Sequence, residues 1–281
     1  MAEPFGASAP AGIDRAVIAL TGQLPDNWLG LRLAIGLRRI VTMRMAGDDG
    51  FDVTCWGFKL RLHPLRNGCE KGALFTPQMY EVPERQELFA DIDRALAEGR
   101  TFSFVDIGAN VGLFSFLVAS RAGSRASILA VEPDPENLRR LRFNIAANPG
   151  VPIRVVATAL GEAEGTLVLQ PNLSDRGGTR TRAAKGGEPE TATRVACRPL
   201  LQVLQERGIR TIDALKIDTE GAEDKILIPF FRDAEHSLWP RLILIEDTSA
   251  EWDKDLFAVL AQAGYAVSRR TKLNVILRRA A

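Results

Sequence analysis

Residues 101 to 281 alternate between short apolar runs and amphipathic stretches, and this alternation constrains the fold more than any other feature of the sequence. Short β-branched apolar runs indicate strands, whereas apolar residues at every third or fourth position indicate helices. We expect strands at residues 102–107, 127–132, 153–157, 212–217, 241–246, 264–269 and 273–278. We expect helices near residues 112–122, 134–147, 198–207, 221–231 and 252–263. Such alternation is typical of an α/β fold, with a parallel sheet covered by helices on both faces.

The last two expected strands are separated only by residues 270–272. A parallel crossover needs about a dozen residues or more, so these strands must be antiparallel neighbours. The sequence therefore predicts a mostly parallel, Rossmann-like seven-stranded sheet with an antiparallel last strand. A polar, glycine-rich insertion at residues 171–193 interrupts the pattern between apparent strands 166–170 and 194–197, and loops of this length are usually functional lids or disordered. Its charged residues could close on an anionic acceptor or simply be solvated: Arg176, Arg180, Arg182, Lys185, Asp175 and Glu188.

Residues 1–100 have a different pattern, and we divide the chain into this helical and hairpin segment and a domain at residues 101–281. Residues 1–12 are rich in Ala, Pro and Gly and are expected to be a loose tail. Helices are expected at residues 13–22, 26–45 (with Asp26 as N-cap) and 83–96, and a hairpin at residues 51–62 that turns at Trp56 and Gly57.

Composition excludes several classes of protein. Lys+Arg 36 against Asp+Glu 35 gives a net charge of +1, which provides no field for a nucleic-acid partner. The three cysteines, Cys55, Cys69 and Cys197, form no metal pair or disulfide framework, which favours a cytoplasmic setting. We expect no secretory signal, because residues 1–12 lack a basic region and an apolar region. No run of 18 apolar residues occurs, so we expect no transmembrane segment.

The stretch from Trp28 to Met45 is the most apolar part of the N-terminal segment, but four arginines interrupt it. We interpret it as an amphipathic helix. It could lie on an anionic membrane or a glycolipid, although packing against the sheet domain or against a partner in a homo-oligomer is the favoured interpretation.

The run FVDIGANVGLF at residues 104–114 predicts a buried strand, a glycine turn and the start of a helix. Gly108 and Gly112 lack a Cβ and permit close approach of a ligand. Asp106, just before the turn, would repel a dinucleotide pyrophosphate but would suit the cationic amino group and sulfonium of S-adenosylmethionine. Glu132 closes the next strand, where a carboxylate can accept hydrogen bonds from ribose hydroxyls. A dehydrogenase-type nucleotide site, or a turn with an incidental acid, is the alternative interpretation.

Four motifs, followed by LILIED, together resemble the FkbM family of methyltransferases: VDIGANVGLFSFLVA, AVEPDPENLRRLRFNIAAN, ALGEAEGTLVL and LKIDTEGAEDKIL. The resemblance covers about residues 101–250. It implies a class I methyltransferase fold, S-adenosylmethionine as cofactor, and methyl transfer, usually to a hydroxyl oxygen of a sugar or natural product. It also implies cofactor-binding roles for Asp106, Gly108, Asn110, Gly112 and Glu132.

Acidic residues follow two neighbouring strands at the edge where open α/β sheets bind ligands. Asp218 follows the strand that contains Lys216, and Glu246 and Asp247 end the next strand. Lys216 shares a face with Asp218, so it either forms a salt bridge or orients the acceptor. Asp218, Glu246 and Lys216 are therefore the candidate catalytic residues.

Methylation of oxygen needs a base, and histidine is the usual choice. His236 lies in a connection that returns to the opposite edge of the sheet, and His63 could cap the pocket. The alternative is a Mg²⁺ ion held by Asp218, Glu246 and Asp247, which would bind vicinal hydroxyls and lower their pKa. This arrangement is similar to that of metal-dependent sugar O-methyltransferases.

We therefore predict methyl transfer from S-adenosylmethionine to a hydroxyl of a sugar or glycosylated small molecule, with the N-terminal segment forming part of the acceptor pocket. Two alternatives stay open: an N-methyltransferase of a small molecule or polypeptide, and a non-catalytic cofactor-binding subunit. Asp218-Thr-Glu-Gly replaces the Asn/Asp-Pro-Pro-aromatic motif that favours the first, and the intact acids at 106, 132 and 218 argue against the second.

Overall fold

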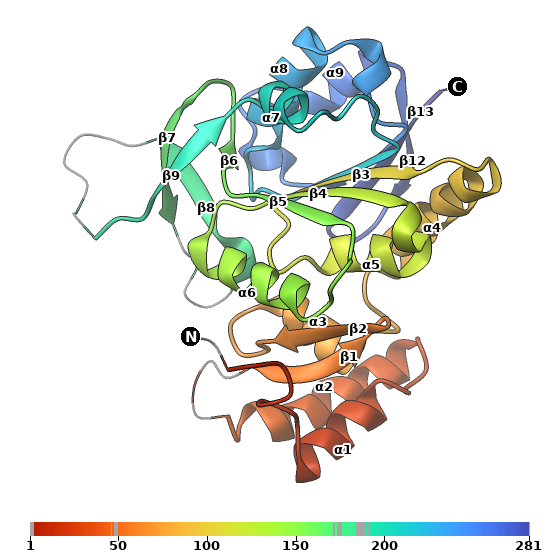
Figure 1. Cartoon of the computed structure of the whole chain (residues 1–281), viewed down its shortest axis with the longest axis vertical. Coiled ribbons are helices and arrows are strands. Elements are labelled where there is room, and N and C mark those ends of the chain that lie inside the picture. Colours follow the sequence, from red (N-terminus) through yellow and green to blue (C-terminus); the bar gives the residue numbers. More distant parts are fainter. Residues whose placement is uncertain are drawn as a thin grey trace.

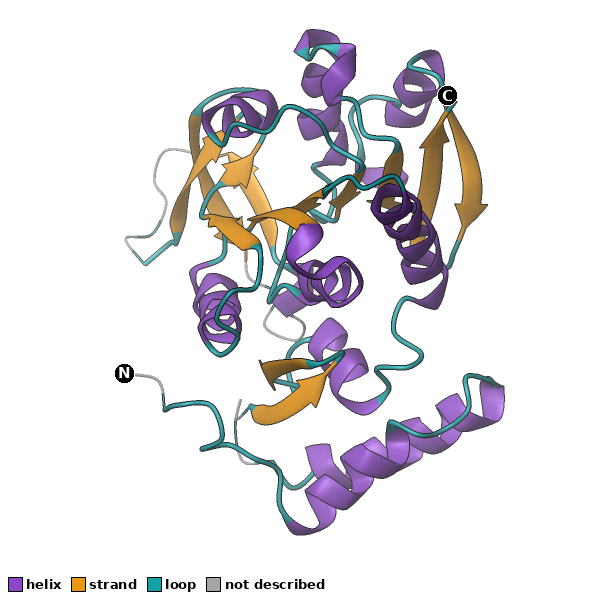
Figure 2. Cartoon of the chain, turned by 45° about the vertical axis from the view of Figure 1, so that its right-hand side comes forward, coloured by secondary structure: helices purple, strands orange, loops and turns teal. Residues whose placement is uncertain are grey.

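The computed structural model describes residues 3–45, 47, 50–170, 172, 176–183, 189 and 191–280. Figure 1 shows a larger part built around a central sheet and a smaller N-terminal part below it. The β1–β2 hairpin lies between the helix pair α1–α2 and the sheet-bearing part, as Figure 2 also shows. The candidate site described below lies between these two parts.

The central sheet has seven strands in the order β12-β13-β11-β10-β3-β4-β5. Its members are β3 (Phe102–Ile107), β4 (Ala126–Val131), β5 (Ile153–Val156), β10 (Ala214–Ile217), β11 (Leu242–Glu246), β12 (Tyr265–Arg270) and β13 (Asn274–Arg279). β13 pairs antiparallel with both β11 and β12, and the pairs formed by the other strands are parallel. The predicted Rossmann-like sheet with an antiparallel last strand is confirmed.

Helices cover both faces of this sheet and bury two separate apolar clusters. One cluster contains residues of three helices: α4 (Val82–Ala97), α5 (Leu113–Ala122) and α6 (Pro135–Ala146). The other cluster contains residues of α7 (Leu200–Glu206), α8 (Glu223–Asp233) and α9 (Leu256–Gln262). Ion pairs from Arg278 to Glu87 and Asp91 also tie α4 to β13. The structure therefore places α4, which precedes residue 101, against the sheet.

The insertion contains more regular structure than the sequence predicts. β8 (Arg180–Ala183) pairs with β7 (Gly165–Gln170) in a second sheet that also holds β9 (Arg194–Arg198) and β6 (Ala159–Leu160). The expectation of an irregular loop throughout residues 171–193 was therefore wrong, because β8 has no apolar alternation and forms by pairing with β7. Asp175, Lys185 and Glu188 lie outside the described residues, as does the side chain of Arg176.

The N-terminal part comprises α1 (Gly12–Thr21), α2 (Trp28–Thr42), β1 (Phe51–Cys55), β2 (Phe58–Leu62) and α3 (Gly68–Phe75). The sequence did not predict α3, which is short and contains Gly68 and Gly72. The N-cap of α2 is Asn27, whose side chain accepts from the N–H of Gly30, and not Asp26.

The described part of the expected loose tail is held against the hairpin. The N–H groups of Gly6 and Ser8 donate to one carboxylate oxygen of Asp52, at 2.7 and 3.0 Å. Arg61 pairs with the same carboxylate at 2.7 Å and also donates to the carbonyl of Pro4 at 3.0 Å. The composition of residues 1–12 suggested a loose tail because it could not reveal the partner Asp52, which lies 46 residues from Gly6 and 44 from Ser8 in sequence.

Candidate active site

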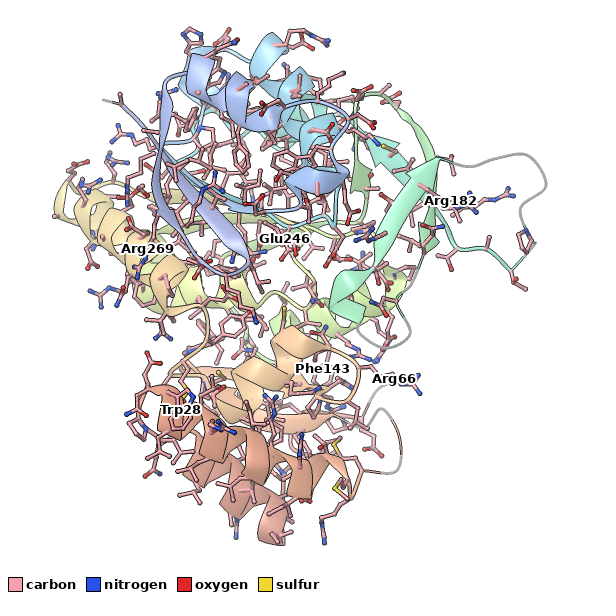
Figure 3. All side chains as sticks on the ribbon, turned by 180° about the vertical axis from the view of Figure 1, so that it is seen from behind. Trp28, Arg66, Phe143, Arg182, Glu246 and Arg269 are labelled. Carbon is pink, nitrogen blue, oxygen red and sulfur yellow. The ribbon has the colours of Figure 1, made fainter. Side chains whose placement is uncertain are left out.

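A cavity of about 640 Å³ lies beyond the carboxyl ends of β3, β4, β10 and β11, where the sequence places its candidate residues. In Figure 3, which shows the molecule from behind, Glu246 lies near the centre, between the sheet and the N-terminal helices. All the predicted site residues except Gly112 and Asp247 line the cavity: Asp106, Gly108, Asn110, Glu132, Lys216, Asp218 and Glu246. Thr158, which lies between β5 and β6, and Asn274, the first residue of β13, also line it.

The glycine turn after β3 is fixed by contacts within the protein. Gly108 has φ +72, and a Cβ there would lie 1.8 Å from the backbone oxygen of Asp218. Gly112 has φ +88, and its Cβ would lie 2.5 Å from the side chain of Leu141 on α6. The N–H groups of Gly108 and Ala109 both donate to the carbonyl of Val131, at 3.0 Å. The glycines therefore allow β3, β4 and β10 to meet closely at the rim, in addition to leaving room for a ligand.

Glu132 is buried, and N–H groups surround its carboxylate. Its two oxygens accept from the backbone of Asn110 at 2.7 Å and of Asp134 at 2.9 Å. The side-chain amide of Asn137 lies at 3.5 Å. Burial raises the pKa of Glu132, and the two backbone N–H groups oppose that rise. The carboxylate is thereby held in one orientation at the cavity wall.

Asp106 is 1% exposed and is tied to the first turn of α5. One of its oxygens accepts from the N–H of Ser115 at 3.1 Å and from the hydroxyl of Ser115 at 2.6 Å. Burial raises the pKa of Asp106, while the charge of Lys216 and the bonds from Ser115 lower it. Asp106 thus lies at the cavity wall as a fixed, deeply buried carboxylate.

Lys216 projects from the central strand β10 and pairs with Asp218 at 2.8 Å. The ammonium also lies 4.9 Å from the centre of the Phe114 ring. Burial by itself would lower the pKa of Lys216, but the charges of Asp218 and Asp106 outweigh it, so the pKa is raised. Lys216 is therefore a cation at neutral pH, and both acids benefit from its charge.

Two further acids, Glu220 and Glu246, lie beside Asp218 of this pair. Oxygens of Asp218, Glu220 and Glu246 all lie within 4.8 Å of one another. Burial, followed by the charges of Asp218 and Glu220, raises the pKa of Glu246 to about 9. One oxygen of Glu246 is buried and makes no hydrogen bond to any described residue. Glu220 has φ +58, a conformation that strains any residue except glycine and that is often found at functional sites.

Glu220, and not Asp247, completes this acidic cluster. Asp247 pairs with Arg270 at 2.8 Å, accepts from Ser249 at 2.7 Å and does not line the cavity. Both Glu220 and Asp247 are acids close to a strand end, so sequence reasoning alone could not choose between them. The neighbouring Glu223 is fully buried and accepts hydrogen bonds from Thr219, Thr248 and Trp252. It thereby connects the start of α8 to the segment that follows β11.

Neither histidine lines the cavity. His63 lines a second hollow of about 390 Å³ together with Gly50, Arg61 and Arg139. The ring of His236 stacks on Trp239, with ring centres 4.1 Å apart. The expectation that His63 could cap the pocket is not supported, because the chain after β2 turns the histidine towards the hairpin side.

The N-terminal part and the insertion supply the opposite wall of the cavity. Its residues are Leu31 and Arg38 of α2, Gly68, Cys69 and Gly72 of α3, the segment residues Thr76, Met79, Tyr80 and Glu81, and Asn172, Gly177, Gly178, Thr179 and Thr181 of the insertion. Burial and the neighbouring Glu84 raise the pKa of Glu81 to about 7, while Lys216 lowers it. Arg180 of the insertion does not line the cavity, and its side chain pairs with Glu251 at 2.5 Å.

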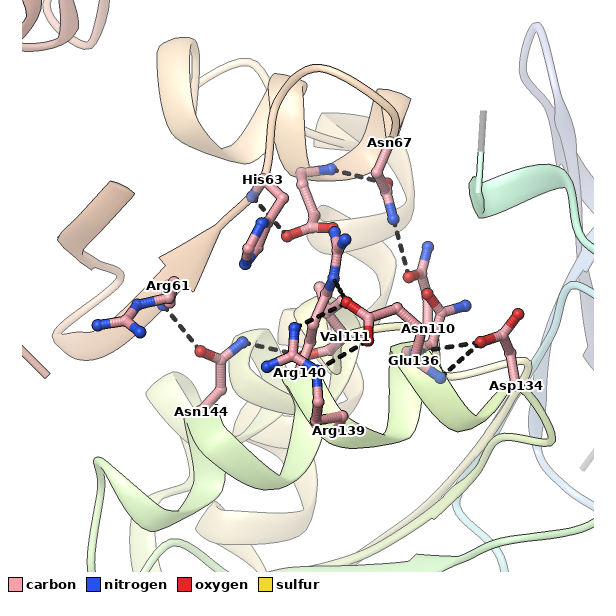
Figure 4. Close-up of polar contacts among 12 residues, drawn as sticks. Arg61, His63, Asn67, Asn110, Val111, Asp134, Glu136, Arg139, Arg140 and Asn144 are labelled. Atoms are coloured by element: carbon pink, nitrogen blue, oxygen red, sulfur yellow. Dashed lines mark hydrogen bonds and ion pairs between the residues drawn. The ribbon is translucent and has the colours of Figure 1, made fainter. Parts of the chain in front are cut away.

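Polar contacts connect this wall to the glycine turn and to α6, and Figure 4 shows two of them. The side chain of Asn67, which caps α3, donates to the side chain of Asn110 in the glycine turn at 2.9 Å. Arg140 of α6 pairs with Glu70 of α3 at 2.8 Å, and both side chains are almost completely buried. The position of the N-terminal part relative to the glycine turn is therefore fixed by specific polar contacts.

Residues 106–267 match the methyltransferase FkbM domain family. Methyltransferase sdnD of Sordaria araneosa is 30% identical over 214 residues, which cover 66% of this chain and 82% of sdnD. AMB antimetabolite synthetase AmbE of Pseudomonas aeruginosa is 31% identical over 157 residues, which cover 44% of this chain and 7% of AmbE. Among solved structures, methyltransferase FkbM from Methylobacillus flagellatus is 19% identical with a TM-score of 0.42, and the match covers 63% of this chain and 44% of that one.

Proposed function

We propose that this chain methylates a hydroxyl oxygen of a sugar or glycosylated small molecule. The premise is that the chain belongs to the FkbM family of S-adenosylmethionine-dependent methyltransferases. The observation that carries the choice of oxygen is the pairing of Asp218 with buried Lys216 at the cavity rim. This pairing places a buried cation against the carboxylate that would accept the hydroxyl proton.

The residues on the glycine-turn side fit the cofactor. We assign Glu132 to the ribose hydroxyls, because a carboxylate can accept about four hydrogen bonds. The protein supplies three of them, from the backbone of Asn110 and Asp134 and the side chain of Asn137. Asp106 provides the negative charge that a cationic amino group or sulfonium requires, and Gly108, Asn110 and Gly112 shape the turn beside it. The bound cofactor supplies a methyl group on a positively charged sulfur.

In the proposed mechanism, Asp218 accepts the proton of the acceptor hydroxyl as the oxygen forms its new bond. Lys216 orients the Asp218 carboxylate and stabilises its charge before the proton arrives. Glu246, with a pKa of about 9, is protonated at neutral pH and can donate a hydrogen bond to the acceptor or to Asp218. Proton transfer of this kind typically contributes about 10²- to 10⁴-fold to the rate.

The test compares Asp218→Asn with the unchanged protein. We expect micromolar binding of S-adenosylmethionine and S-adenosylhomocysteine to both proteins by isothermal titration, and about a 10²-fold or greater loss of labelled methyl transfer to sugar acceptors in the variant. Full activity of Asp218→Asn would contradict the role of Asp218. Absence of cofactor binding to the unchanged protein would contradict the proposed function.

A divalent cation is a second candidate for activating the hydroxyl. The oxygens of Asp218, Glu220 and Glu246 lie within 4.8 Å of one another and are hard ligands of the kind that Mg²⁺ prefers, and a bound Mg²⁺ would displace the proton from Glu246. Asp247 is not a candidate ligand in this arrangement, because it is paired with Arg270. Turnover that stops in EDTA and returns with Mg²⁺ would support the cation, and turnover that is unchanged in EDTA would leave the proton acceptor Asp218 as the activating group.

A further inference from the structure

The helix pair α1–α2 exposes an unusual amount of apolar surface. Within the described chain, all the exposed large apolar residues except Val267 and Leu273 lie between residues 13 and 43. Trp28 is 69% exposed and Met43 is 84% exposed. Contiguous exposed apolar surface of this kind marks a site of interaction with a protein or a membrane. In Figure 3, Trp28 lies at the side of the N-terminal part.

The exposed residues of α2 form one continuous face. Gly30, Ala34 and Val41 bury one side of the helix against the protein. Leu29, Leu33 and Ile40 are spaced by four and seven residues and therefore follow one line along the exposed side. We call this surface the α2 face and define it by Trp28, Leu29, Arg32, Leu33, Arg39, Ile40 and Met43.

The charge of the α2 face is entirely positive. The helix contains Arg32, Arg38 and Arg39 and no acidic residue. The ion pairs found among the described residues do not involve any of these three arginines, and Arg32 instead lies 4.9 Å from the centre of the Trp28 ring. Burial and the adjacent charge of Arg39 lower the pKa of Arg38. An apolar surface with interspersed, unneutralised arginines is complementary to a surface that is both apolar and anionic.

The α2 face is also continuous with the mouth of the candidate active site. Leu31 is exposed to solvent and lines the cavity. Arg38, which lies about two helical turns after Leu31 on α2, also lines the cavity. Exposed Leu273 lies at the same cavity and adds apolar surface to its mouth. No helix in the described residues is long and apolar enough to span a bilayer, so contact with lipid would be interfacial.

We propose that the α2 face docks on the surface of an anionic lipid bilayer. Trp28, Leu33 and Ile40 enter the boundary between headgroups and acyl chains, and Arg32 and Arg39 meet lipid phosphates. The docking does not depend on the proposed function. Its consequence does: the cavity mouth then lies beside the bilayer, and the sugar acceptor is one that a lipid carries.

The test measures co-sedimentation of the full chain with vesicles, without cofactor or acceptor, so that its result is independent of turnover. We expect the protein to bind vesicles of phosphatidylcholine that contain phosphatidylglycerol, and to be released by high salt. We expect Arg32→Gln/Arg39→Gln to lower the partition coefficient about 25-fold, since each arginine contributes about fivefold near an anionic surface. We expect Leu33→Gln/Ile40→Gln to lower it on the order of tenfold, because two apolar side chains no longer enter the headgroup boundary.

Matched controls change the same residue types elsewhere. Val267→Gln alters an exposed apolar residue of β12, and Arg207→Gln/Arg210→Gln alters exposed arginines after α7, at the opposite end of the molecule in Figure 1. Both should bind as the unchanged protein does. Thermal unfolding followed by circular dichroism checks that every variant is folded.

Three results would overturn the proposal. The first is no binding to the anionic vesicles, and the second is equal loss of binding in the control variants. The third is a dimer in light scattering that the Leu33→Gln/Ile40→Gln variant dissociates, because the α2 face would then be covered by a second copy of the chain and not by lipid.

Discussion

The two walls of the cavity near the sheet hold carboxylates with raised pKa values, Glu132 and Glu246, in opposite surroundings. On the glycine-turn wall, burial raises the pKa of Glu132 to about 8, and the backbone N–H groups of Asn110 and Asp134 oppose that rise without cancelling it. On the acidic wall, Glu246 faces Asp218 and further acids, which add to the effect of burial and raise its pKa to about 9. Burial is common to both carboxylates, so the difference lies in the neighbouring groups.

This difference indicates how each wall can act. A carboxylate held by backbone N–H groups keeps its geometry whatever ligand binds, which suits recognition. A carboxylate beside other acids can change its protonation or accept a cation at little cost, which suits chemistry. Lys216 limits the negative charge of the acidic wall, and the glycine turn supplies the rigidity of the other wall.

The largest effect should come from removing the rigidity of the glycine-turn wall. In Gly108→Ala the new Cβ would overlap the backbone oxygen of Asp218, at 1.8 Å, and would need φ +72. We expect a loss of about 3 kcal/mol or more in the free energy of unfolding and loss of cofactor binding. Urea unfolding and isothermal titration measure the two effects.

Gly99→Ala is the matched control. Gly99 has φ +73, but a Cβ there would meet nothing within 4 Å. It should cost about 1–2 kcal/mol, the conformational term alone. Equal losses in the two variants would show that the contact between the turn and β10 contributes nothing to the rigidity of the wall.

The next effect should come from the cation of the acidic wall. Lys216→Met leaves Asp218 and Asp106 without the charge that balances them, and breaking a buried pair costs about 3 kcal/mol. The loss, measured by urea unfolding at neutral pH, should shrink at acidic pH as the carboxylates are protonated. Lys225→Met removes an exposed pair with Asp253 and should change stability by less than about 1 kcal/mol. If Lys216→Met lost no more stability than Lys225→Met, the charge of Lys216 would not be needed to balance Asp218 and Asp106.

The elements of the sheet were predictable because each strand of the sheet carries its own apolar pattern. Residues 102–107 and 112–122 contain enough local information to fix β3 and α5 closely, and the short connection at residues 270–272 fixed the antiparallel strand. Strand β8 and helix α3 could not be predicted in this way. β8 depends on its pairing with β7, and α3 depends on the Glu70–Arg140 pair, and neither partner is close in sequence.

The candidate site shows the same division. Asp106 lies near the end of β3, and Glu132 and Asp218 directly follow β4 and β10, so strand prediction also placed them at the cavity. The choice between Glu220 and Asp247 depends on tertiary contacts, because Arg270, 23 residues further along the chain, pairs with Asp247 and holds it away from the cavity. The opposite wall of the cavity was expected only as a segment, because its residues are brought there by tertiary contacts.

A smaller effect on stability should come from the protonation of Glu246 on the acidic wall. The raised pKa of Glu246 means that the folded protein binds an extra proton between the ordinary pKa of 4.5 and about 9, so stability falls as pH rises through that window. Glu246→Gln removes this dependence. The variant should match the unchanged protein below pH 4.5 and exceed it by about 1–2 kcal/mol near pH 9, where partial exposure screens the charge.

Urea unfolding over a series of pH values tests this expectation, with the exposed Glu235→Gln as a control that should show no such trend. If Mg²⁺ binds the cluster, it should restore stability at high pH in the unchanged protein and much less in Glu246→Gln. A pH profile that is the same for both proteins would remove the proposed difference between the two walls.

The smallest effect should come from separating the glycine turn from the N-terminal wall. Asn67 caps α3 by accepting from the N–H of Glu70 at 3.1 Å, and its amide also donates to Asn110. Asn27 caps α2 in the same way, by accepting from the N–H of Gly30 at 2.9 Å. Each Asn→Ala change should cost about 1 kcal/mol for the cap. Only Asn67→Ala should also weaken cofactor binding, by a few-fold, because Asn110 then loses the contact that positions it against the N-terminal part. Titration of S-adenosylmethionine into both variants decides the matter: equal affinities would mean that the glycine turn holds its geometry without the N-terminal wall.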